Sequence, residues 1–413
     1  MEAIFEKKQV KQSLRAISSK SEAHRALICA ALADRQTKII CTDTNDDIDA
    51  TVSCLNSLGA DIKRDGEAFT VTPIHTLPQK AELDCNESGS TLRFMLPLVA
   101  ALGVDCVYNM RGRLASRPLS PLYELMSENG VTLSPQGINP LSVSGKLSAG
   151  EYSVAANISS QFISGLLFAL SICKGESKLS LEGNIESAPY IDMTVDALKL
   201  FGADISFEEK RSCFYIVGKE KLCSPKTVSV GGDWSNAAFF LSAGAIGKTP
   251  VTVSGLDTNS RQGDKKIISI LEGMGADVSV RGSNVTISPS ALHGTEIDAS
   301  QIPDLVPIIA TVASVAQGKT TIYNASRLRL KESDRIESVC ATLSALGANI
   351  LATDDGMIIN GKEKLSGGIC DSFNDHRIAM SAAIASLVCE NAVRIERFEA
   401  INKSYPSFMD NFD

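Results

Sequence analysis

A short charged stretch, Leu330 to Arg335, holds the residue types that bind phosphates and carboxylates and that move protons. Its two cations, Lys331 and Arg335, are four residues apart, with Glu332 between them in the sequence. The apolar residues that follow recur every three or four positions, which predicts an amphipathic helix. We therefore expect the charged group on the first turn of that helix, with both cations on one face.

Two interpretations of this stretch are open from its own residues. A helix N-terminus carries partial positive charge, so cations there require compensation. Glu332 and Asp334 would provide it within the stretch, and Asp334 would cap the helix or orient Arg335. In the second interpretation, a bound anion completes the site. Taken alone, the stretch favours internal charge balance.

Polar and cationic residues also open two predicted helices near the start of the chain. Lys20 and Arg25 lie in the first, where Ser19 and Glu22 fit a capping box. Residues 87–93 open the second with a Gly/Ser turn, whose backbone N–H groups are accessible to an anion. Each segment, taken alone, is ordinary for a solvated helix start.

Four more segments have the same character. Residues 111–118 hold three arginines, which suit bidentate contacts with carboxylates or phosphates, and we expect Pro118 to begin a helix. Residues 159–162 bring two hydroxyls and an amide to another helix start. Asp304 precedes an apolar run and is expected to be an N-cap, as is the aspartate of residues 374–377.

The recurrence of cations at helix starts favours bound anions over solvated surfaces. Each such cation costs about 0.3–1 kcal/mol at an exposed site. The chain has a formal net charge of −8, so an excess of basic residues does not account for the repetition. We therefore expect several of these helix ends to converge on anionic ligands.

An internal repeat indicates which elements position these residues. Successive members of a set of five glycines are separated by 71–73 residues, namely Gly59, Gly130, Gly202, Gly275 and Gly347. Each follows a predicted helix and precedes a predicted β-hairpin. An Ala/Leu-rich helix and a strand interleave with this signature, which gives six copies of one size. An open solenoid fits less well, because the copies share no surface motif.

The length, net charge and cysteine content of the chain exclude several classes of protein. Its 413 residues exceed what one hydrophobic core normally serves, so we expect two domains of three copies, with a boundary in residues 222–227. The net charge disfavours nucleic acid and acidic membranes as partners. Eleven scattered cysteines predict reduced thiols, and neither a signal peptide nor a membrane-spanning run is recognisable. We therefore expect a cytoplasmic protein.

The ordered motifs resemble those of the 5-enolpyruvylshikimate-3-phosphate synthase family, the 3-phosphoshikimate 1-carboxyvinyltransferases. The most specific pair is Lys331-Glu332-x-Asp334-Arg335 with Asn374-Asp375-His376-Arg377. The other motifs occur in order over nearly the whole chain: Ser19-Lys20-Ser21-x-x-x-Arg25, Gly89-Ser90-x-x-Arg93, Arg113-x-x-x-Arg117-Pro118, Ser159-Ser160-Gln161-Phe162, Pro189-Tyr190-Ile191-Asp192, Ile302-Pro303-Asp304 and Lys403-x-x-Pro406.

The resemblance implies an α/β fold, namely a two-domain inside-out α/β barrel (inverse α/β prism) of six βαβαββ repeats, three per domain. It implies that residues 1–15 and 228–413 form one discontinuous domain and residues 16–227 the other. The active site is then expected in the cleft between them. The resemblance also implies a monomer that needs no metal and no cofactor.

The implied reaction transfers the enolpyruvyl group of phosphoenolpyruvate to the 5-hydroxyl of shikimate 3-phosphate, on the way to chorismate and the aromatic amino acids. Both substrates are polyanions, which accounts for the cations at the helix starts. By resemblance, the residues that hold shikimate 3-phosphate are Lys20, Ser21, Arg25, Ser159, Ser160, Gln161, Ser187, Asp304 and Lys331. Those that hold phosphoenolpyruvate are Lys20, Gly89, Arg117, Gln161, Arg335, Arg377 and Lys403.

The implied mechanism is addition followed by elimination, without a covalent enzyme intermediate. Asp304 is expected to take the proton of the 5-hydroxyl. Glu332, with Lys20 nearby, is expected to serve the C3 carbon of phosphoenolpyruvate. Lys403 and His376 complete the expected catalytic set.

The chain departs from the family's pattern at three places. Ile17-Ser18 stands where the family usually has Pro-Gly, and Arg327 where an Asn is often found. Glu87 also replaces an Asn, and we expect it to turn away from phosphoenolpyruvate. The nearest alternative family, UDP-N-acetylglucosamine enolpyruvyl transferase, has a Cys where this chain has Gly112. A non-catalytic repeat scaffold would not need this ordered set of motifs.

Overall fold

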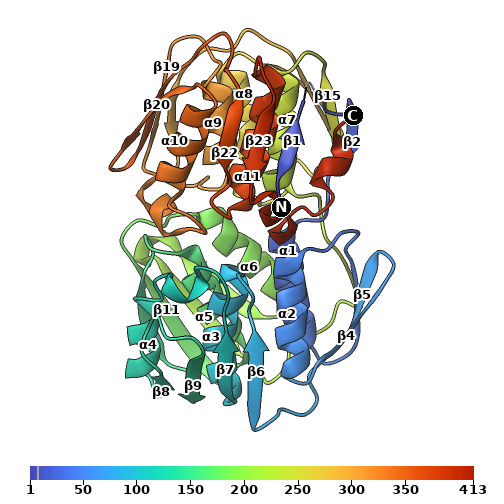
Figure 1. Cartoon of the computed structure of the whole chain (residues 1–413). Coiled ribbons are helices and arrows are strands. Elements are labelled where there is room, and N and C mark those ends of the chain that lie inside the picture. Colours follow the sequence, from blue (N-terminus) through green and yellow to red (C-terminus); the bar gives the residue numbers. More distant parts are fainter. Residues whose placement is uncertain (7–8) are drawn as a thin grey trace. The chain divides into compact units, whose positions relative to one another are not determined.

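The structure, a computed structural model, describes residues 1–6 and 9–413. It divides into two compact units, which Figure 1 draws as a ribbon. Unit 1 comprises Met1–Ile17 and Gly231–Asp413, and unit 2 comprises Ser18–Val230. Unit 2 is therefore inserted between two segments of unit 1.

Unit 2 alternates helices with strands, and its last element returns to the first sheet. In chain order the elements are α1 (Lys20–Ala31), β3 (Thr37–Ile40), α2 (Asp46–Ser57), β4 (Asp61–Asp65), β5 (Ala68–Thr72), β6 (Lys80–Asp84), α3 (Gly89–Leu102), β7 (Asp105–Asn109), η1 (Leu114–Ser116), α4 (Leu122–Glu128), β8 (Val131–Leu133), β9 (Leu141–Gly145), β10 (Glu151–Ala155), α5 (Ser160–Ile172), β11 (Gly175–Glu182), α6 (Ala188–Leu200), β12 (Asp204–Glu208), η2 (Glu209–Arg211), β13 (Cys213–Gly218) and β14 (Thr227–Ser229).

The three sheets of unit 2 have one topology. Their strand orders are β14-β3-β5-β4, β6-β7-β9-β8 and β10-β11-β13-β12. In the sheet of β6, for example, β6 pairs in parallel with β7, while β8 and β9 form an antiparallel hairpin that joins β7 through β9. Each copy is thus a βαβαββ unit, which confirms the repeat expected from the glycine spacing.

Unit 1 follows the same plan. Its elements are β1 (Ala3–Phe5), β2 (Ser13–Arg15), α7 (Trp234–Ile246), β15 (Val251–Ser254), η3 (Gly263–Lys266), α8 (Ile267–Gly273), β16 (Asp277–Arg281), β17 (Asn284–Ser288), β18 (Glu296–Asp298), α9 (Val306–Ala313), β19 (Lys319–Tyr323), η4 (Ser326–Leu330), α10 (Arg335–Ala345), β20 (Asn349–Thr353), β21 (Gly356–Asn360), β22 (Gly368–Asp371), α11 (His376–Ala385), η5 (Ser386–Val388), β23 (Val393–Glu396), η6 (Phe398–Lys403) and η7 (Phe408–Asn411).

Two sheets of unit 1 are completed by strands from the start of the chain. The sheet orders are β16-β17-β15-β2, β18-β19-β21-β20 and β1-β23-β22. Strand β2 pairs in parallel with β15, just as β14 pairs with β3 in unit 2. Strand β1 runs antiparallel to β23 and takes the place of a hairpin in the last copy. The segment before unit 2 is therefore part of the sheets of unit 1.

The five repeated glycines end helices as expected. Their φ angles lie between 74° and 101°, the left-handed region that favours glycine. At Gly59 an added Cβ would lie 2.6 Å from the carbonyl oxygen of Thr76, so the position also has no room for a side chain. The left-handed conformation that glycine allows therefore determines where five helices end: α2, α4, α6, α8 and α10.

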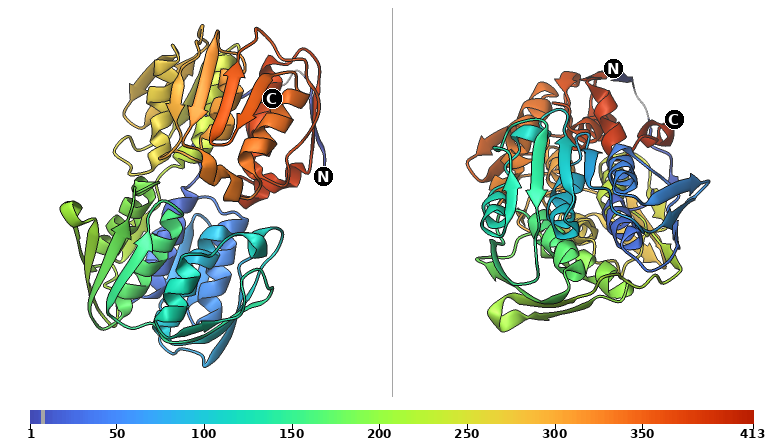
Figure 2. Two further views of the ribbon diagram at one scale, coloured as in Figure 1. Left: turned by 90° about the vertical axis from the view of Figure 1, so that its left-hand side faces the viewer. Right: turned by 90° about the horizontal axis from the view of Figure 1, so that it is seen from below.

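The helices lie inside each unit and the sheets outside, as Figure 2 shows. Helices α5 and α7 bury almost every residue, as expected of helices that are apolar on all sides. The strands instead alternate: in β10, Tyr152 and Val154 are buried while Glu151 and Ser153 are exposed. Each unit has its own hydrophobic core. The expected fold class, an inside-out α/β barrel, is confirmed.

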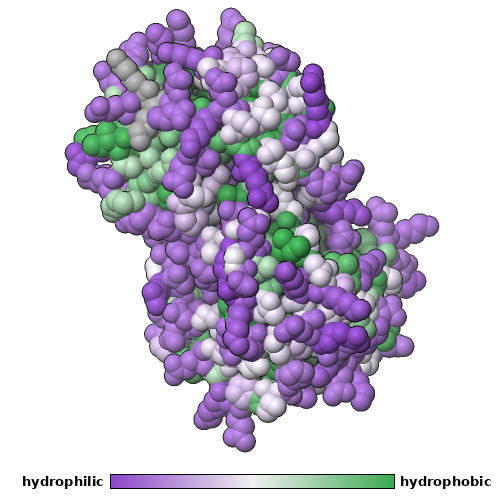
Figure 3. Space-filling view, turned by 90° about the vertical axis from the view of Figure 1, so that its right-hand side faces the viewer, coloured by the Kyte–Doolittle hydropathy of each residue, from purple (hydrophilic) through white to green (hydrophobic). Residues whose placement is uncertain are grey.

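The face drawn in Figure 3 is mostly hydrophilic, with apolar residues in small patches. Among the residues that the structure describes, no helix combines the length and the apolar character needed to span a bilayer.

The helix start expected at Pro118 is wrong. The sequence predicts that Pro118 begins a helix, but α4 begins at Leu122 with Pro121 as its N-cap. Ser120 precedes that second proline, and a residue before proline disfavours the helical conformation. The helix therefore cannot extend back to Pro118.

Candidate active site

The guanidinium of Arg335 is the centre of a charged cluster in unit 1. Its side chain is 1% exposed, and it donates to three carboxylates. Nη1 lies 2.7 Å from Asp304 Oδ1, Nη2 lies 2.7 Å from Glu332 Oε2, and Nε lies 2.8 Å from Asp375 Oδ2. Burial lowers the pKa of Arg335, but the charges of Asp375, Glu332 and Asp304 more than reverse this, so the group stays ionised.

Asp304 meets two further cations. Arg377 Nη2 lies 3.3 Å from Asp304 Oδ2, and Lys331 Nζ lies 3.9 Å from Oδ1. Burial raises the pKa of Asp304, but Arg377, Lys331 and Arg335 together hold it well below its ordinary range. The expectation that Asp304 caps a helix is wrong: α9 begins at Val306, its N-cap is Leu305, and the carboxylate turns to the cations instead.

Lys331 and Glu332 lie in a loop before the helix and not on its first turn, contrary to expectation. The N-cap of α10 is Asp334, whose Oδ1 accepts the backbone N–H of Glu337, and the helix begins at Arg335. The structural role expected for Asp334 is thus confirmed. Burial lowers the pKa of Lys331 to about 8, although Asp304 opposes the shift. This lysine therefore titrates near physiological pH.

Asp375 joins this loop to α11. As the N-cap of α11 it accepts the N–H of Arg377 at 3.0 Å, which confirms the expected cap. The same buried carboxylate accepts a hydrogen bond from the hydroxyl of Ser333 at 3.2 Å. Lys403 donates to the carbonyl of Asn374 at 2.6 Å. One connected part of unit 1 therefore holds seven of the expected site residues: Asp304, Lys331, Glu332, Arg335, His376, Arg377 and Lys403.

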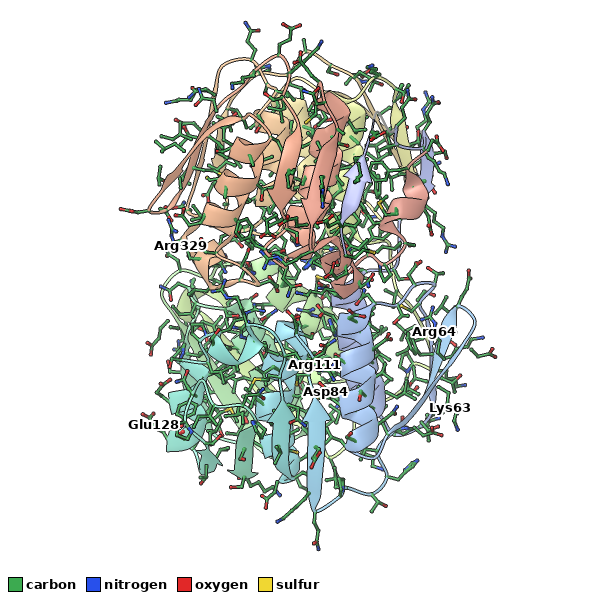
Figure 4. All side chains as sticks on the ribbon, in the orientation of Figure 1. Lys63, Arg64, Asp84, Arg111, Glu128 and Arg329 are labelled. Carbon is green, nitrogen blue, oxygen red and sulfur yellow. The ribbon has the colours of Figure 1, made fainter. Side chains whose placement is uncertain are left out.

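Two residues that the sequence analysis passed over support this cluster. Arg329, labelled in Figure 4, donates to Asp334 and Glu337, each at 3.0 Å, and to the carbonyl of Thr353 at 2.8 Å. Asp264 is buried, accepts a hydrogen bond from the Ser235 hydroxyl, and has its pKa raised to about 6 by burial and by the charge of Asp304. Asp264 has no local sequence signal, because Ser235 lies 29 residues before it. Arg329 lies close in sequence to Asp334 and Glu337, so its nearness to these carboxylates was the signal that could have found it.

In unit 2, Lys20 opens α1 and pairs with a carboxylate from the next helix. Ser19 is the N-cap of α1 and accepts the N–H of Glu22 at 3.3 Å, so the cap predicted there is confirmed. Lys20 Nζ lies 2.6 Å from Asp47 Oδ2, with both side chains largely buried. Asp47 was not singled out from the sequence.

Arg25 cross-links α1 to α6. Nε donates to Thr194 Oγ1 at 2.8 Å, Nη1 to the carbonyl of Ser21 at 2.8 Å, and Nη2 to the carbonyl of Tyr190 at 2.7 Å. The guanidinium also lies over the ring of Phe94, 5.3 Å from its centroid. Each of its three nitrogens has a protein partner, so the guanidinium is held in a fixed position between the two helices.

The start of α3 brings together three expected site residues, Gly89, Arg117 and Gln161. Ser88 is the N-cap, and an added Cβ at Gly89 would lie 2.6 Å from Nη1 of Arg117. Gln161 accepts a hydrogen bond from Arg93 Nη1 at 2.8 Å and donates to Ser90 Oγ at 2.8 Å. Only glycine lets the guanidinium of Arg117 lie this close to the helix backbone.

The loop that carries Arg117 is fixed to the ends of β6 and β7. Arg111 donates to Asp84 Oδ2 at 2.8 Å, and both are labelled in Figure 4. The side chain of Asn139 accepts from the N–H of Met110 at 3.0 Å and donates to its carbonyl at 2.8 Å. These contacts hold the start of the arginine loop against the ends of the two strands.

Glu87 packs against Gly112. An added Cβ at Gly112 would lie 2.5 Å from Glu87 Oε2, and the φ angle of Gly112 is 53°. A cysteine, as in the alternative family, would displace this carboxylate. The departure at Glu87 therefore lies against Gly112, the residue that distinguishes this chain from the alternative family.

Comparisons with known proteins agree with this geometry. A family profile described as EPSP synthase (3-phosphoshikimate 1-carboxyvinyltransferase) matches residues 4–412. A 3-phosphoshikimate 1-carboxyvinyltransferase from Clostridium perfringens is 43% identical over 408 residues, covering 98% of this chain and 96% of that protein. One from Clostridioides difficile is 40% identical, covering 95% of this chain and 92% of that protein.

The chain belongs to the EPSP synthase family. A solved structure of EPSP synthase from Acinetobacter baumannii matches with a TM-score of 0.80 and 27% identity, covering 98% of this chain and 95% of that one. The family and enzyme class expected from the sequence are confirmed, and the alternative enolpyruvyl transferase is not favoured.

Proposed function

We propose that this chain transfers the enolpyruvyl group of phosphoenolpyruvate to the 5-hydroxyl of shikimate 3-phosphate and releases phosphate. The observation that carries the proposal is the start of α3, where Arg117 lies against Gly89 and Gln161 links Ser90 to Arg93. Arginines beside the N–H groups of a helix N-terminus suit an anion that has both a carboxylate and a phosphate. Membership of the EPSP synthase family supports the same reaction.

We assign the residues that hold each substrate by resemblance to the family. We assign shikimate 3-phosphate to a set of cationic, hydroxyl, amide and carboxylate side chains: Lys20, Ser21, Arg25, Ser159, Ser160, Gln161, Ser187, Asp304 and Lys331. We assign phosphoenolpyruvate to Lys20, Gly89, Arg117, Gln161, Arg335, Arg377 and Lys403. Arg335 is held by three carboxylates, so its role includes orienting them as well as binding an anion.

The addition step requires two proton movements. The 5-hydroxyl loses its proton to Asp304 as its oxygen bonds to C2 of phosphoenolpyruvate, and C3 gains a proton from Glu332. In the elimination step C3 returns a proton to Glu332 as the C2–O bond to phosphate breaks, which restores the double bond, and the proton held by Asp304 passes to the leaving phosphate. Lys20 and Lys403 offset the charge of the reacting groups, and His376, the first residue of α11, completes the catalytic set.

Substrate binding activates Asp304 in this scheme. As placed, its cationic neighbours hold its pKa well below the ordinary range, which makes it ionised but a weak base. When Lys331 and Arg377 engage the anionic substrates, they stabilise the carboxylate of Asp304 less. The pKa of Asp304 then rises, and its basicity rises with it.

The direct test mixes purified protein with phosphoenolpyruvate and one of two acceptors, then follows phosphate. We expect release with shikimate 3-phosphate and none with UDP-N-acetylglucosamine. The reverse pattern would exclude the proposed function.

We also propose that the protein is a cytoplasmic monomer. All eleven cysteines are free and nine are buried, which suits a reducing compartment. Light scattering after size-exclusion chromatography should give the mass of one chain at every loading concentration. A stable dimer would contradict the proposal.

A further inference from the structure

Four buried polar side chains form a continuous series of hydrogen bonds behind the starts of α1, α2 and α3. His24 Nδ1 lies 2.7 Å from Thr51 Oγ1, which lies 2.7 Å from Thr91 Oγ1. The Thr91 hydroxyl donates to Ser88 Oγ at 2.8 Å. None of these residues is more than 1% exposed. We refer to His24, Thr51, Thr91 and Ser88 as the polar relay.

The direction of the relay follows from counting protons. Each threonine hydroxyl has one proton to donate. The Thr91 hydroxyl donates to Ser88 Oγ at 2.8 Å, and its contact with the carbonyl of Asp47 is longer, at 3.4 Å. The proton between the threonines therefore belongs to Thr51, and His24 Nδ1 must be the donor to Thr51. The relay thus fixes one tautomer of a neutral imidazole.

The relay ends at the residue that sets the start of α3. Ser88 is the N-cap and accepts the N–H of Thr91 as well as its hydroxyl. The next residue is Gly89, against which Arg117 lies, followed by Ser90, which accepts a hydrogen bond from Gln161. A shift of Ser88 would move the helix N–H groups and the contact with Arg117 together.

The relay also lies one helical turn from a second feature of the site. His24 is four residues beyond Lys20 in α1, and Thr51 is four residues beyond Asp47 in α2. Lys20 and Asp47 form the ion pair that links these two helix starts. Apolar side chains would fill the same space without removing four polar groups from water. The directional bonds therefore indicate a positioning role more than a packing role.

We propose that His24 is a positioning residue for phosphoenolpyruvate, which acts through Thr51 and Thr91 to fix Ser88 and the start of α3. His24 itself does not touch the substrate. The inference rests on the proposed function, because it takes Gly89 and Arg117 as part of the phosphoenolpyruvate site.

Three variants test the role of the donor. His24→Phe keeps a ring and removes the donor, whereas His24→Asn places an N–H the same number of bonds from the backbone. We expect His24→Phe and Thr51→Val to raise KM for phosphoenolpyruvate about fivefold to tenfold, the effect of one or two lost hydrogen bonds. KM for shikimate 3-phosphate should change less than about twofold in these variants. In His24→Asn, KM for phosphoenolpyruvate should lie within about twofold of the wild-type value.

Two further variants separate the possible failures. Ser171→Ala removes another buried hydroxyl of unit 2, which donates to the carbonyl of Leu167 at 2.7 Å, and should leave both KM values unchanged. Arg117→Lys tests the phosphoenolpyruvate site itself. If Arg117→Lys does not raise KM for phosphoenolpyruvate, the site assignment fails. If it does and the folded His24→Phe does not, the relay has no positioning role.

Nitrogen NMR of histidine-labelled protein checks the direction of the relay without activity. We expect His24 in the Nδ1–H form, with Nε2 unprotonated. Thr51→Val should remove this preference. A wild-type spectrum with His24 in the Nε2–H form would overturn the inference.

Discussion

At the scale of residues, three cations and three carboxylates form one cluster around Arg335. The residue types were predictable from the motifs, because phosphate and carboxylate ligands require cations. The pairing was not predictable, since Arg335 meets Asp375 across 40 residues and Asp304 across 31. An aspartate just before an apolar run is normally expected to cap a helix. At Asp304 the attraction of cations that are distant in sequence is stronger than this local preference, so the carboxylate pairs with them instead.

The lowered pKa of Lys331, about 8, predicts a pH limit on substrate binding. Below pH 8 the ammonium is charged and can hold the phosphate of shikimate 3-phosphate, whereas above pH 8 it is increasingly neutral. We expect KM for shikimate 3-phosphate to rise as pH increases through 8. Lys331→Arg stays charged because the guanidinium pKa exceeds about 12, so the rise should move to higher pH. An unchanged limit in that variant would contradict the assignment.

Replacement of the proposed base tests the chemistry more directly. Asp304→Asn keeps the shape and removes the charge, so kcat should fall on the order of 10²–10⁴-fold. Circular dichroism should show the wild-type fold. A folded variant with kcat close to that of the wild type would show that another group takes the 5-hydroxyl proton.

At the scale of elements, the loop before α10 shows why helix starts were only partly predictable. Glu332 and Asp334 are both acidic, and the sequence alone does not tell which one caps the helix. Arg329 contributes to the outcome by binding Asp334, Glu337 and the backbone of β20. The capped helix then leaves Lys331 and Glu332 in the loop.

Arg329→Gln should therefore affect function more than stability. Its ion pairs are partly exposed, and such pairs stabilise a fold by only about 0.2–1 kcal/mol. The loop that holds Lys331 would lose its support, so we expect KM for shikimate 3-phosphate to rise several-fold with little change in Tm. Lys63→Gln, which removes an exposed pair with Asp61, is the matched control and should change neither. Equal effects of the two variants would exclude this role for Arg329.

The contact between Glu87 and Gly112 predicts a non-additive pair. Gly112→Ala adds a Cβ that overlaps the Glu87 carboxylate and strains a φ of 53°, so KM for phosphoenolpyruvate should rise. Glu87→Asn shortens the side chain and should partly relieve the overlap in the double variant. A double-mutant cycle on kcat/KM measures the coupling. Strict additivity would show that the contact has no functional consequence.

At the scale of the whole molecule, repetition made the fold predictable. The five glycines require a left-handed conformation that local chemistry specifies, so the helix ends were correct. The strands at the junctions were not predictable from periodicity, because β1, β2 and β14 pair with partners far along the chain. The polar relay had no sequence signal either, since its members come from three helices.

The segment that precedes unit 2 in the sequence should stabilise unit 1 but not unit 2. Phe5 is 1% exposed and packs against Phe398 and Phe412, with ring centroids 5.5 and 5.3 Å away. Phe5→Ala should cost about 3–5 kcal/mol of the free energy of unfolding. Hydrogen exchange should quicken in β22, β23 and α11, whereas unit 2 keeps its protection. Phe207→Ala, at a half-exposed position of unit 2, is the control, and equal loss of protection in both units would contradict the expectation.

The pairing of β2 with β15 has a consequence for the protein as it leaves the ribosome. Strand β2 pairs with β15, and the Ser254 hydroxyl donates to the carbonyl of Leu14 across 240 residues of sequence. Because β15 is translated so much later, β2 has no partner strand when it is made. Unit 2, by contrast, has every strand of its sheets once β14 has been made. Because domains tend to fold as they emerge, the inserted unit can fold first. Strands β1 and β2 are then synthesised before unit 2 but reach their native partners after it has folded.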